Sequence, residues 1–224
     1  MDKIVAANWK MNKSISQSEK FVRKLKKVDV RNNVIIFPSF IALPAVSQIL
    51  EKERCGAQDS FYESSGAHTG EVSPEMIKEV ADYVIIGHSE RRAKGETNEI
   101  LNKKVKACSA AGLKIIFCVG EKEGEDSHAV VKKQIIEGLK GTDALTDFVI
   151  IAYEPVWAIG TGKTPETDEI MEAVKYIKSL YSCEVLYGGS VNGENAEEIL
   201  KICDGVLVGS ASLDFQSFLK IARS

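Results

Sequence analysis

The chain has 224 residues, of which 44% are hydrophobic, and a formal net charge of −3 at pH 7. This length allows one large packed core, and we expect a single domain over residues 1–224. The mild acidity gives no reason to expect nucleic acid or a membrane as a partner. The longest early apolar run, Ile4–Ala7, is too short for a signal peptide or a membrane span.

The five cysteines form neither a C-x-x-C pair nor a metal-binding cluster with histidine. They are Cys55, Cys108, Cys118, Cys183 and Cys203. Their odd number and apolar surroundings predict reduced, mostly buried thiols and a cytoplasmic location. This setting does not favour a nucleophilic role for Cys118.

Short apolar runs alternate with amphipathic stretches along the whole chain. The runs predict strands buried on both faces, because they show no polar alternation. The expected strands are Ile4–Asn8, Val34–Phe37, Arg54–Gln58, Tyr83–Gly87, Lys114–Val119, Phe148–Tyr153, Glu184–Tyr187 and Gly205–Val208. The expected helices include Gln17–Lys27, Glu99–Ala110, Ala129–Gly138, Glu166–Leu180 and Ala196–Lys201.

Two local signals mark helix starts. Ser16, followed three residues later by Glu19, predicts an N-cap and a capping box for the first helix. Pro74 after Ser73 predicts the start of another helix.

The regular β–α alternation predicts a parallel sheet. Eight such units without a linker favour an α/β fold in which eight parallel strands close into a (β/α)8 barrel inside a layer of helices. The alternative is an open doubly wound sheet. That fold would want a glycine fingerprint after the first strand, and Asn8–Met11 has none.

In such a barrel, functional residues gather at the carboxyl ends of the strands. These ends carry Asn8-Trp9-Lys10, Gln58, His88, Glu121, Glu154, Gly188-Gly189-Ser190 and Gly209-Ser210. Unrelated surface residues would not all fall at strand ends. We therefore predict one site on this rim, with a cation, an imidazole, a carboxylate and two glycine-rich turns.

Glu154 ends a strand, and the hinges Pro155–Trp157 and Lys163–Thr164 frame a glycine-bearing segment after it. Such a segment is typical of a mobile lid loop. Excluding water strengthens a carboxylate as a base, so Glu154 suits proton abstraction from carbon next to a carbonyl. We expect Ile159 and Leu207 to form an apolar clamp around it.

The lid sequence GTGKT is not a nucleotide-binding P-loop. The first glycine of that motif would fall at Trp157, so we reject this interpretation.

His88 begins a short predicted helix, whose dipole disfavours the imidazolium ion. The neutral ring would donate a hydrogen bond to a developing enediolate oxygen, and Lys10 would place a positive charge near a carbonyl or phosphate oxygen. The turns Gly188–Ser190 and Gly209–Ser210, with Gly160 of the lid, would bind a phosphate through backbone N–H groups. This chemistry requires neither a metal nor a cofactor.

Five blocks resemble the triosephosphate isomerase family and follow the family's order up to residue 213. They are AANWKMN, IIGHSERR, AYEPVWAIGTGKT, LYGGSVN and LVGSASL, of which the third is highly specific. The resemblance implies a TIM barrel enzyme of glycolysis and gluconeogenesis. Its reaction would be the cofactor-free interconversion of dihydroxyacetone phosphate and D-glyceraldehyde 3-phosphate through an enediolate.

The resemblance also implies residue roles. Glu154 would be the base, His88 the neutral electrophile and Lys10 the electrostatic stabiliser. The substrate-binding positions would be Asn8, Lys10, Gly160, Gly189, Ser190, Gly209 and Ser210. The supporting residues would be Glu90 near Lys10, Glu121 against Trp157, and Leu207.

The family is a homodimer, in which a loop of each subunit enters its partner near the catalytic asparagine and lysine. The segment Gly66–Glu71 resembles that loop. Thr69 would reach across the interface, and His68 replaces the usual aromatic residue at the loop tip.

The chain departs from the family at several places. Ser210 replaces a second glycine after the last strand, and Glu184 replaces the arginine of one salt bridge. Thr164 runs directly into Pro165, where the family has additional small residues, and Pro165 has no N–H to bond the Tyr187 hydroxyl. We therefore expect altered lid kinetics. The chain is also shorter than the ~250 residues typical of the fold, and we expect the loss in helices and outer loops.

Two other classes stay open. A Schiff-base aldolase of similar architecture would use Lys10 and would be trapped covalently by borohydride. A catalytically inactive phosphate-binding barrel would have no need of Glu154, His88 and Lys10 together with an intact lid.

Overall fold

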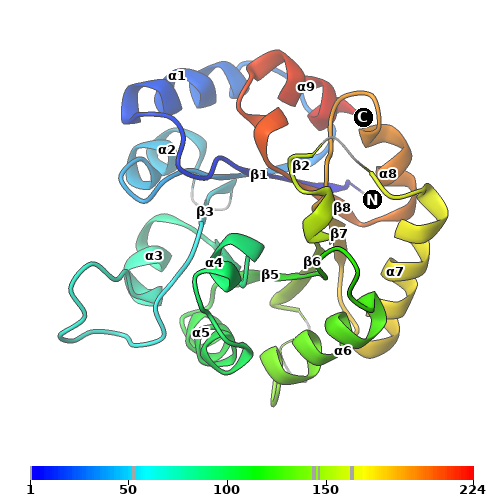
Figure 1. Cartoon of the computed structure of the whole chain (residues 1–224). Helices are drawn as coiled ribbons and strands as arrows, with labels where there is room; N and C mark the ends of the chain where they lie inside the picture. Colours follow the sequence, from blue (N-terminus) through cyan, green and yellow to red (C-terminus); the bar gives the residue numbers. More distant parts are fainter. Residues whose placement is uncertain (1, 52–53, 143–144, 146, 162–163) are drawn as a thin grey trace.

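A computed structural model describes residues 2–51, 54–142, 145, 147–161 and 164–224 (Figure 1). Its eight strands are parallel and lie in the order β2-β1-β8-β7-β6-β5-β4-β3. The strands are β1 Ile4–Asn8, β2 Asn33–Phe37, β3 Gly56–Ala57, β4 Tyr83–Ile86, β5 Lys114–Val119, β6 Val149–Tyr153, β7 Val185–Tyr187 and β8 Gly205–Val208. The α-helices are α1 Ile15–Leu25, α2 Leu43–Leu50, α3 Pro74–Val80, α4 Ser89–Ala93, α5 Asn98–Ala110, α6 Ser127–Gly138, α7 Thr167–Leu180, α8 Ala196–Ile202 and α9 Phe215–Arg223.

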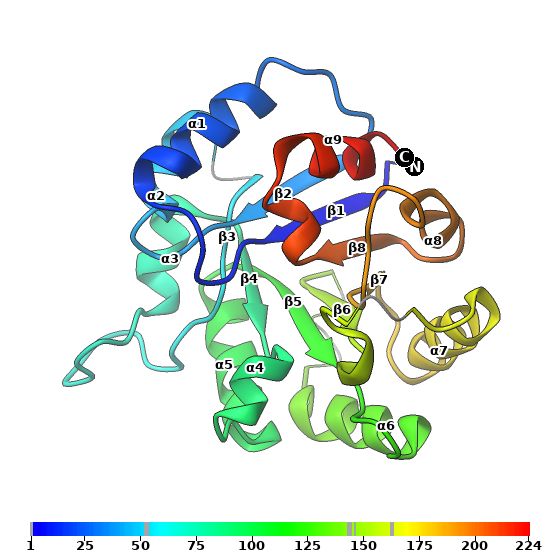
Figure 2. The same cartoon turned by 45° about the horizontal axis from the view of Figure 1, so that its top comes forward.

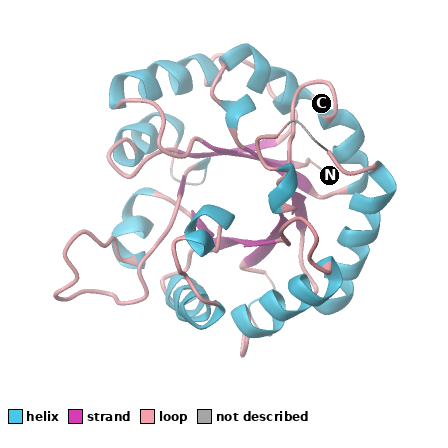
Figure 3. Cartoon of the chain, in the orientation of Figure 1, coloured by secondary structure: helices cyan, strands magenta, loops and turns pink. Residues whose placement is uncertain are grey.

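The two strands at the ends of this order meet and close the sheet. A single parallel bridge between Ile36 and Cys55 joins β2 to β3, whereas five residue pairs join β5 to β6. The helices surround the strands (Figure 3), so the predicted (β/α)8 barrel is confirmed. The junction between β2 and β3 is its most weakly paired seam within the described chain.

Alternate strand residues face two different cores, which explains the absence of polar alternation in the sequence. Ile4 and Ala6 of β1 belong to a cluster made only of strand residues, which fills the barrel interior. Val5 and Ala7 belong to a second cluster that also includes side chains of the outer helices. Both faces of each strand are therefore buried.

The predicted strand ends agree with the structure within one or two residues, and β3 differs most. The expected strand was Arg54–Gln58, but the ladder covers only Gly56–Ala57. Cys55 pairs with β2 through the isolated bridge and accepts the Tyr83 N–H at 3.2 Å, and the Gln58 side chain bonds two carbonyls of neighbouring segments. The expected helices are present, with their ends shifted by at most two residues.

The predicted capping box of the first helix is wrong by two residues. Ser14 is the N-cap: its Oγ accepts from the Gln17 N–H, and the Gln17 side chain accepts from the Ser14 N–H. The helix therefore begins two residues earlier than predicted, and its first turn is closed by the Ser18 N–H to the Ser14 carbonyl at 2.9 Å. The predicted start at Pro74 is confirmed, with Ser73 as the N-cap.

None of the five cysteines forms a disulfide in the described part of the chain, and four of them are buried, whereas Cys183 is partly exposed. No helix in the described part of the chain is long and apolar enough to cross a membrane. The segment between β3 and α3 extends away from the barrel (Figure 2), and residues 63–71 at its tip are exposed.

Candidate functional site

A cavity of about 430 Å³ lies at the carboxyl ends of the strands. Every residue predicted to be catalytic or to bind substrate lines it: Asn8, Lys10, His88, Glu154, Gly160, Gly189, Ser190, Gly209 and Ser210. The predicted clamp residues Ile159 and Leu207 line it too. The predicted supporting residues Glu90, Glu121 and Trp157 are not in this lining.

Glu154 follows the last residue of β6 and is 3% exposed. Its N–H bonds the Val119 carbonyl at 2.7 Å, which fixes the backbone beside β5. Burial raises the pKa of the Glu154 carboxyl, and the nearby His88 and Lys10 partly offset this effect. Its Oε2 has no hydrogen-bond partner among the described residues. An oxygen that is buried without a partner is a candidate base for a bound molecule.

Two glycines make room for Glu154. A Cβ at Gly188 would lie 2.6 Å from the Glu154 Cγ, and a Cβ at Gly120 would overlap the Glu154 carbonyl. Gly188 was predicted as part of an anion-binding turn, but it also lets that turn pack against the carboxylate.

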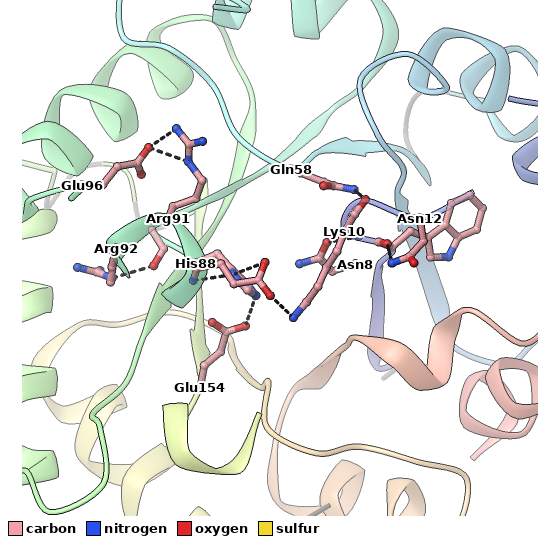
Figure 4. Close-up of polar contacts among 12 residues, drawn as sticks. Asn8, Lys10, Asn12, Gln58, His88, Arg91, Arg92, Glu96 and Glu154 are labelled. Atoms are coloured by element: carbon pink, nitrogen blue, oxygen red, sulfur yellow. Dashed lines mark hydrogen bonds and ion pairs between the residues drawn. The ribbon is translucent and has the colours of Figure 1, made fainter. Parts of the chain in front are cut away.

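His88 is the N-cap of α4, and the residue is 5% exposed. Its Nδ1 accepts a hydrogen bond from the Glu90 N–H at 3.2 Å, so Nδ1 carries no proton. The neutral ring therefore carries its proton on Nε2, which lies 3.5 Å from the Glu154 Oε1 (Figure 4). This tautomer presents a neutral N–H donor next to the carboxylate.

Lys10 has φ = +51°, a left-handed conformation that costs a lysine about 1–2 kcal/mol. Contacts around the residue hold it: its N–H bonds the Asn8 Oδ1 at 3.0 Å, and its Nζ bonds the Glu90 Oε1 at 2.7 Å. Burial raises the pKa of Glu90, but the hydrogen bond and charge of Lys10 outweigh it, and the net shift is downward. The Glu90 carboxyl therefore stays ionised at neutral pH.

The glycine-rich side of the cavity offers backbone groups. Gly209 precedes the short 3-10 helix Ser210–Ser212, and Gly160 has φ = +68°, a conformation that favours glycine. Ser210, which replaces a family glycine, is not among the described residues with positive φ, so the substitution introduces no backbone strain. The Ser190 hydroxyl donates to the Ala158 carbonyl at 2.6 Å and joins the lid to the turn after β7.

The lid segment is anchored at its start. The Trp157 indole donates to the Glu121 Oε1 at 2.9 Å, and the Val156 N–H bonds the Glu121 carbonyl at 2.8 Å. Gly162 and Lys163, which belong to the predicted lid and its second hinge, lie outside the described residues. Thr164 follows them and donates to the Ser190 carbonyl at 3.3 Å.

Three residues at the rim received no role from the sequence, although Gln58 was expected at a strand end. Asn12 lines the cavity and donates to the Trp9 carbonyl at 2.7 Å. Arg92 bonds the Gly87 carbonyl after β4 and the Cys118 carbonyl in β5, at 2.7 and 2.9 Å. Asn12 and Arg92 stand in recognised blocks, but the sequence does not show where their side chains point. Gln58 is the third, and its contacts cross the β2–β3 seam.

A further prediction concerns the charged residue Glu184. Glu184, expected to lack the family salt bridge, forms no ion pair within the described residues, and the nearby Asp204 pairs with Lys178 at 2.6 Å. The described residues contain no group of three or more His, Cys, Asp or Glu that could hold a metal ion.

A (β/α)8 barrel with a carboxylate, a neutral imidazole and glycine turns on its carboxyl rim defines an enzyme suited to proton transfer on a small anion. The family model for triosephosphate isomerase matches residues 3–224. The chain is 44% identical to the triosephosphate isomerase of Dehalococcoides mccartyi strain CBDB1, over 98% of this chain and 95% of that protein. It is 44% identical to that of Dictyoglomus thermophilum over 99% of each chain, and 42% identical to that of Aquifex aeolicus over 100% of each. The chain belongs to the triosephosphate isomerase family.

These comparisons also account for the chain length. The alignment with the Aquifex aeolicus relative spans 246 positions and covers all 224 residues, so at least 22 positions (246 − 224) are gaps in this chain. The eight strands and the rim blocks are nevertheless present.

Proposed function

We propose that the chain interconverts dihydroxyacetone phosphate and D-glyceraldehyde 3-phosphate without a cofactor, as a step of glycolysis and gluconeogenesis. The observation that carries this proposal is the approach of the Glu154 carboxylate to the His88 Nε2 in a cavity that also contains the glycine turns. Family membership supports the same reaction.

In this proposal, Glu154 removes a proton from the carbon next to the substrate carbonyl. The His88 Nε2–H donates a hydrogen bond to the carbonyl oxygen, on which negative charge grows as the enediolate forms. Lys10 stabilises that charge, and Asn8 helps to hold the substrate. The proton of the neighbouring hydroxyl passes to the former carbonyl oxygen, and the same carboxyl returns its proton to the neighbouring carbon, so no proton is lost or gained overall.

The substrate phosphate would lie at the opposite side of the cavity. Backbone N–H groups of Gly189, Ser190, Gly209 and Ser210 would bind it, and Gly160 would add another when the lid closes. Ile159 and Leu207 would then exclude water from Glu154. Exclusion of water strengthens the base, in keeping with the upward pKa shift that burial gives this carboxyl.

A coupled isomerisation assay with D-glyceraldehyde 3-phosphate tests this function. Glu154→Gln keeps the shape of the side chain but removes the base, so kcat should fall about 1,000-fold or more. Glu123→Gln, which alters an exposed carboxylate, is the matched control and should keep the parental kcat. If the parent is inactive but still binds inorganic phosphate, the proposal of an isomerase gives way to that of a phosphate-binding protein. Covalent trapping of Lys10 by borohydride would favour an aldolase.

We also propose a homodimer built by the loop Gly66–Glu71, in a reducing cytoplasmic setting that suits five free thiols. The loop is exposed, and a second cavity of about 400 Å³ beside Lys10 is lined by Met11, Phe40 and Gln58. Met11 is 97% exposed, and insertion of a partner loop there would bury it. Analytical ultracentrifugation should give twice the chain mass for the parent and the single mass for Met11→Glu. A monomeric parent with full activity would contradict the dimer.

A further inference from the structure

The weakest junction of the barrel lies next to the proposed site. One backbone bridge, between Ile36 and Cys55, joins β2 to β3. Just past β3, the half-buried Gln58 side chain crosses this junction. Its Nε2 donates to the Phe37 carbonyl at the end of β2, at 3.0 Å, and to the Lys10 carbonyl after β1, at 2.8 Å (Figure 4). One amide thus connects the ends of three neighbouring strands.

The Lys10 carbonyl belongs to a residue that needs support. Lys10 has φ = +51°, which a lysine adopts only when its surroundings impose it. The Asn8 Oδ1 holds its N–H and Glu90 holds its ammonium group, at 3.0 and 2.7 Å. Within the described chain, Gln58 is the residue that bonds its carbonyl. Without this bond, the peptide after Lys10 could rotate toward a commoner conformation and carry the ammonium group away from the cavity.

We propose that Gln58 is a positioning residue: it fixes the left-handed backbone of Lys10 and closes the rim where the strand ladder fails. The proposal rests on the isomerase function proposed above. Both partners of Gln58 are carbonyl oxygens, so the bridging group must supply two N–H donors from one nitrogen. A carboxylate at this position would face both carbonyls with acceptors alone, and an apolar side chain would leave them unbonded.

The test compares two amides with the same bonding pattern. Gln58→Glu and Gln58→Met remove the two donors, and the second variant avoids a new charge. Asn102→Asp is the matched control, because the Asn102 Nδ2 also donates to two carbonyls, those of Gly138 and Lys140, both at 3.0 Å. These carbonyls lie at the end of α6 and beyond, away from the residues that line the cavity. All three substitutions are expected to lower the melting temperature.

Only the Gln58 variants are expected to lower kcat/KM, by about 10- to 100-fold, because a shift of about 1 Å in a catalytic group has effects of that size. Asn102→Asp should keep the parental value within about threefold. Assays run well below the melting temperatures, at two protein concentrations and with the mass determined at each, separate this loss from unfolding and from dissociation. A loss that disappears at the higher concentration would overturn the proposal.

A double-mutant cycle with Lys10→Met gives the decisive readout. If Gln58 acts through Lys10, adding Gln58→Met to Lys10→Met should change kcat/KM by less than about threefold. Equal losses in the presence and absence of the lysine would overturn the positioning role, as would parental kcat/KM in both folded Gln58 variants. Failure of the proposed function looks different, because the parent itself would then be inactive in the coupled assay.

Discussion

The two halves of the rim present their chemistry in different ways. In the half formed by β1, β4 and β6, charged or titratable side chains do the work: Lys10, His88 and Glu154. In the half formed by β7, β8 and the lid, the cavity wall consists of glycines and uncharged residues, and the charged side chains of the described lining all belong to the first half.

The difference lies in what holds each group in place. His88 depends on the Glu90 N–H, and Lys10 depends on Asn8, Glu90 and Gln58. A backbone N–H in a glycine turn needs no such partner, since its direction follows from the turn itself. We therefore expect substitutions in the first half to act mainly on kcat, and substitutions in the second half mainly on KM.

The largest effect that would test this division is the one expected for His88→Gln. A glutamine at this position cannot reproduce an Nε2–H donor held by a second ring nitrogen, so kcat should fall about 100-fold or more while KM changes little. Steady-state kinetics in the coupled assay measures both constants. His128→Gln alters an exposed histidine and should leave both unchanged. A raised KM with parental kcat in His88→Gln would remove the distinction between the two halves.

Gly209→Ala tests the second half. The added Cβ would lie 3.8 Å from the Lys10 Cε, an ordinary contact, so the fold should be kept. The methyl group would occupy space meant for the phosphate, and KM should rise about tenfold, equivalent to about 1.4 kcal/mol. The inhibition constant of inorganic phosphate should rise in parallel, with kcat within about twofold of the parent. A fall in kcat without a change in phosphate affinity would show that Gly209 acts on the chemical step, as the residues of the first half do.

The same contrast explains what could be predicted from the sequence. Strand ends, glycine turns and the lid follow from local patterns, and the catalytic and substrate-binding residues predicted there line one cavity. The supports do not follow, because they join distant parts of the chain. Gln58 bonds residues 21 and 48 positions away, and Arg92 bonds Cys118 across 26 positions. The bounds of β3 were predicted too wide, as Arg54–Gln58, for the same reason: the length of its ladder depends on the neighbouring strands, of which β4 pairs with two residues and β2 contributes a single bridge.

A smaller effect concerns stability in the first half. Burial raises the pKa of Glu154 in the folded chain, so the folded state binds this proton more tightly than the unfolded state does. Stability from this group is complete at low pH and is lost as pH rises from the ordinary glutamate pKa of 4.5 through the folded value. Glu154→Gln should therefore melt a few degrees above the parent at pH 7, since about 1 kcal/mol corresponds to roughly 2–4 °C.

This gain should shrink as the pH falls toward 4.5 and vanish well below it, where the parent carboxyl is protonated in both states. Calorimetry across the pH range measures it, with Glu123→Gln as the exposed control. A variant that is less stable than the parent at pH 7 would show that the contacts of the carboxylate outweigh its burial.

The smallest effect on stability is expected for Tyr187, the last residue of β7, in the half of the rim that contains the glycine turns. Its hydroxyl is buried and has no hydrogen-bond partner among the described residues. Pro165, which follows the predicted second hinge, offers no N–H. Tyr187→Phe removes a polar group that the fold does not satisfy, so the melting temperature should change by no more than about 2 °C.

A second prediction for Tyr187→Phe concerns the rate at which the predicted lid moves. Temperature-jump fluorescence of Trp157 should give the same relaxation rate for Tyr187→Phe as for the parent. Both should differ from a relative whose hinge carries additional small residues, because such a hinge supplies the N–H that Pro165 lacks. Rates equal to those of the longer-hinged relative would show that the hinge length does not control closure. A slower lid in Tyr187→Phe would show that the hydroxyl bonds another group when the lid is closed.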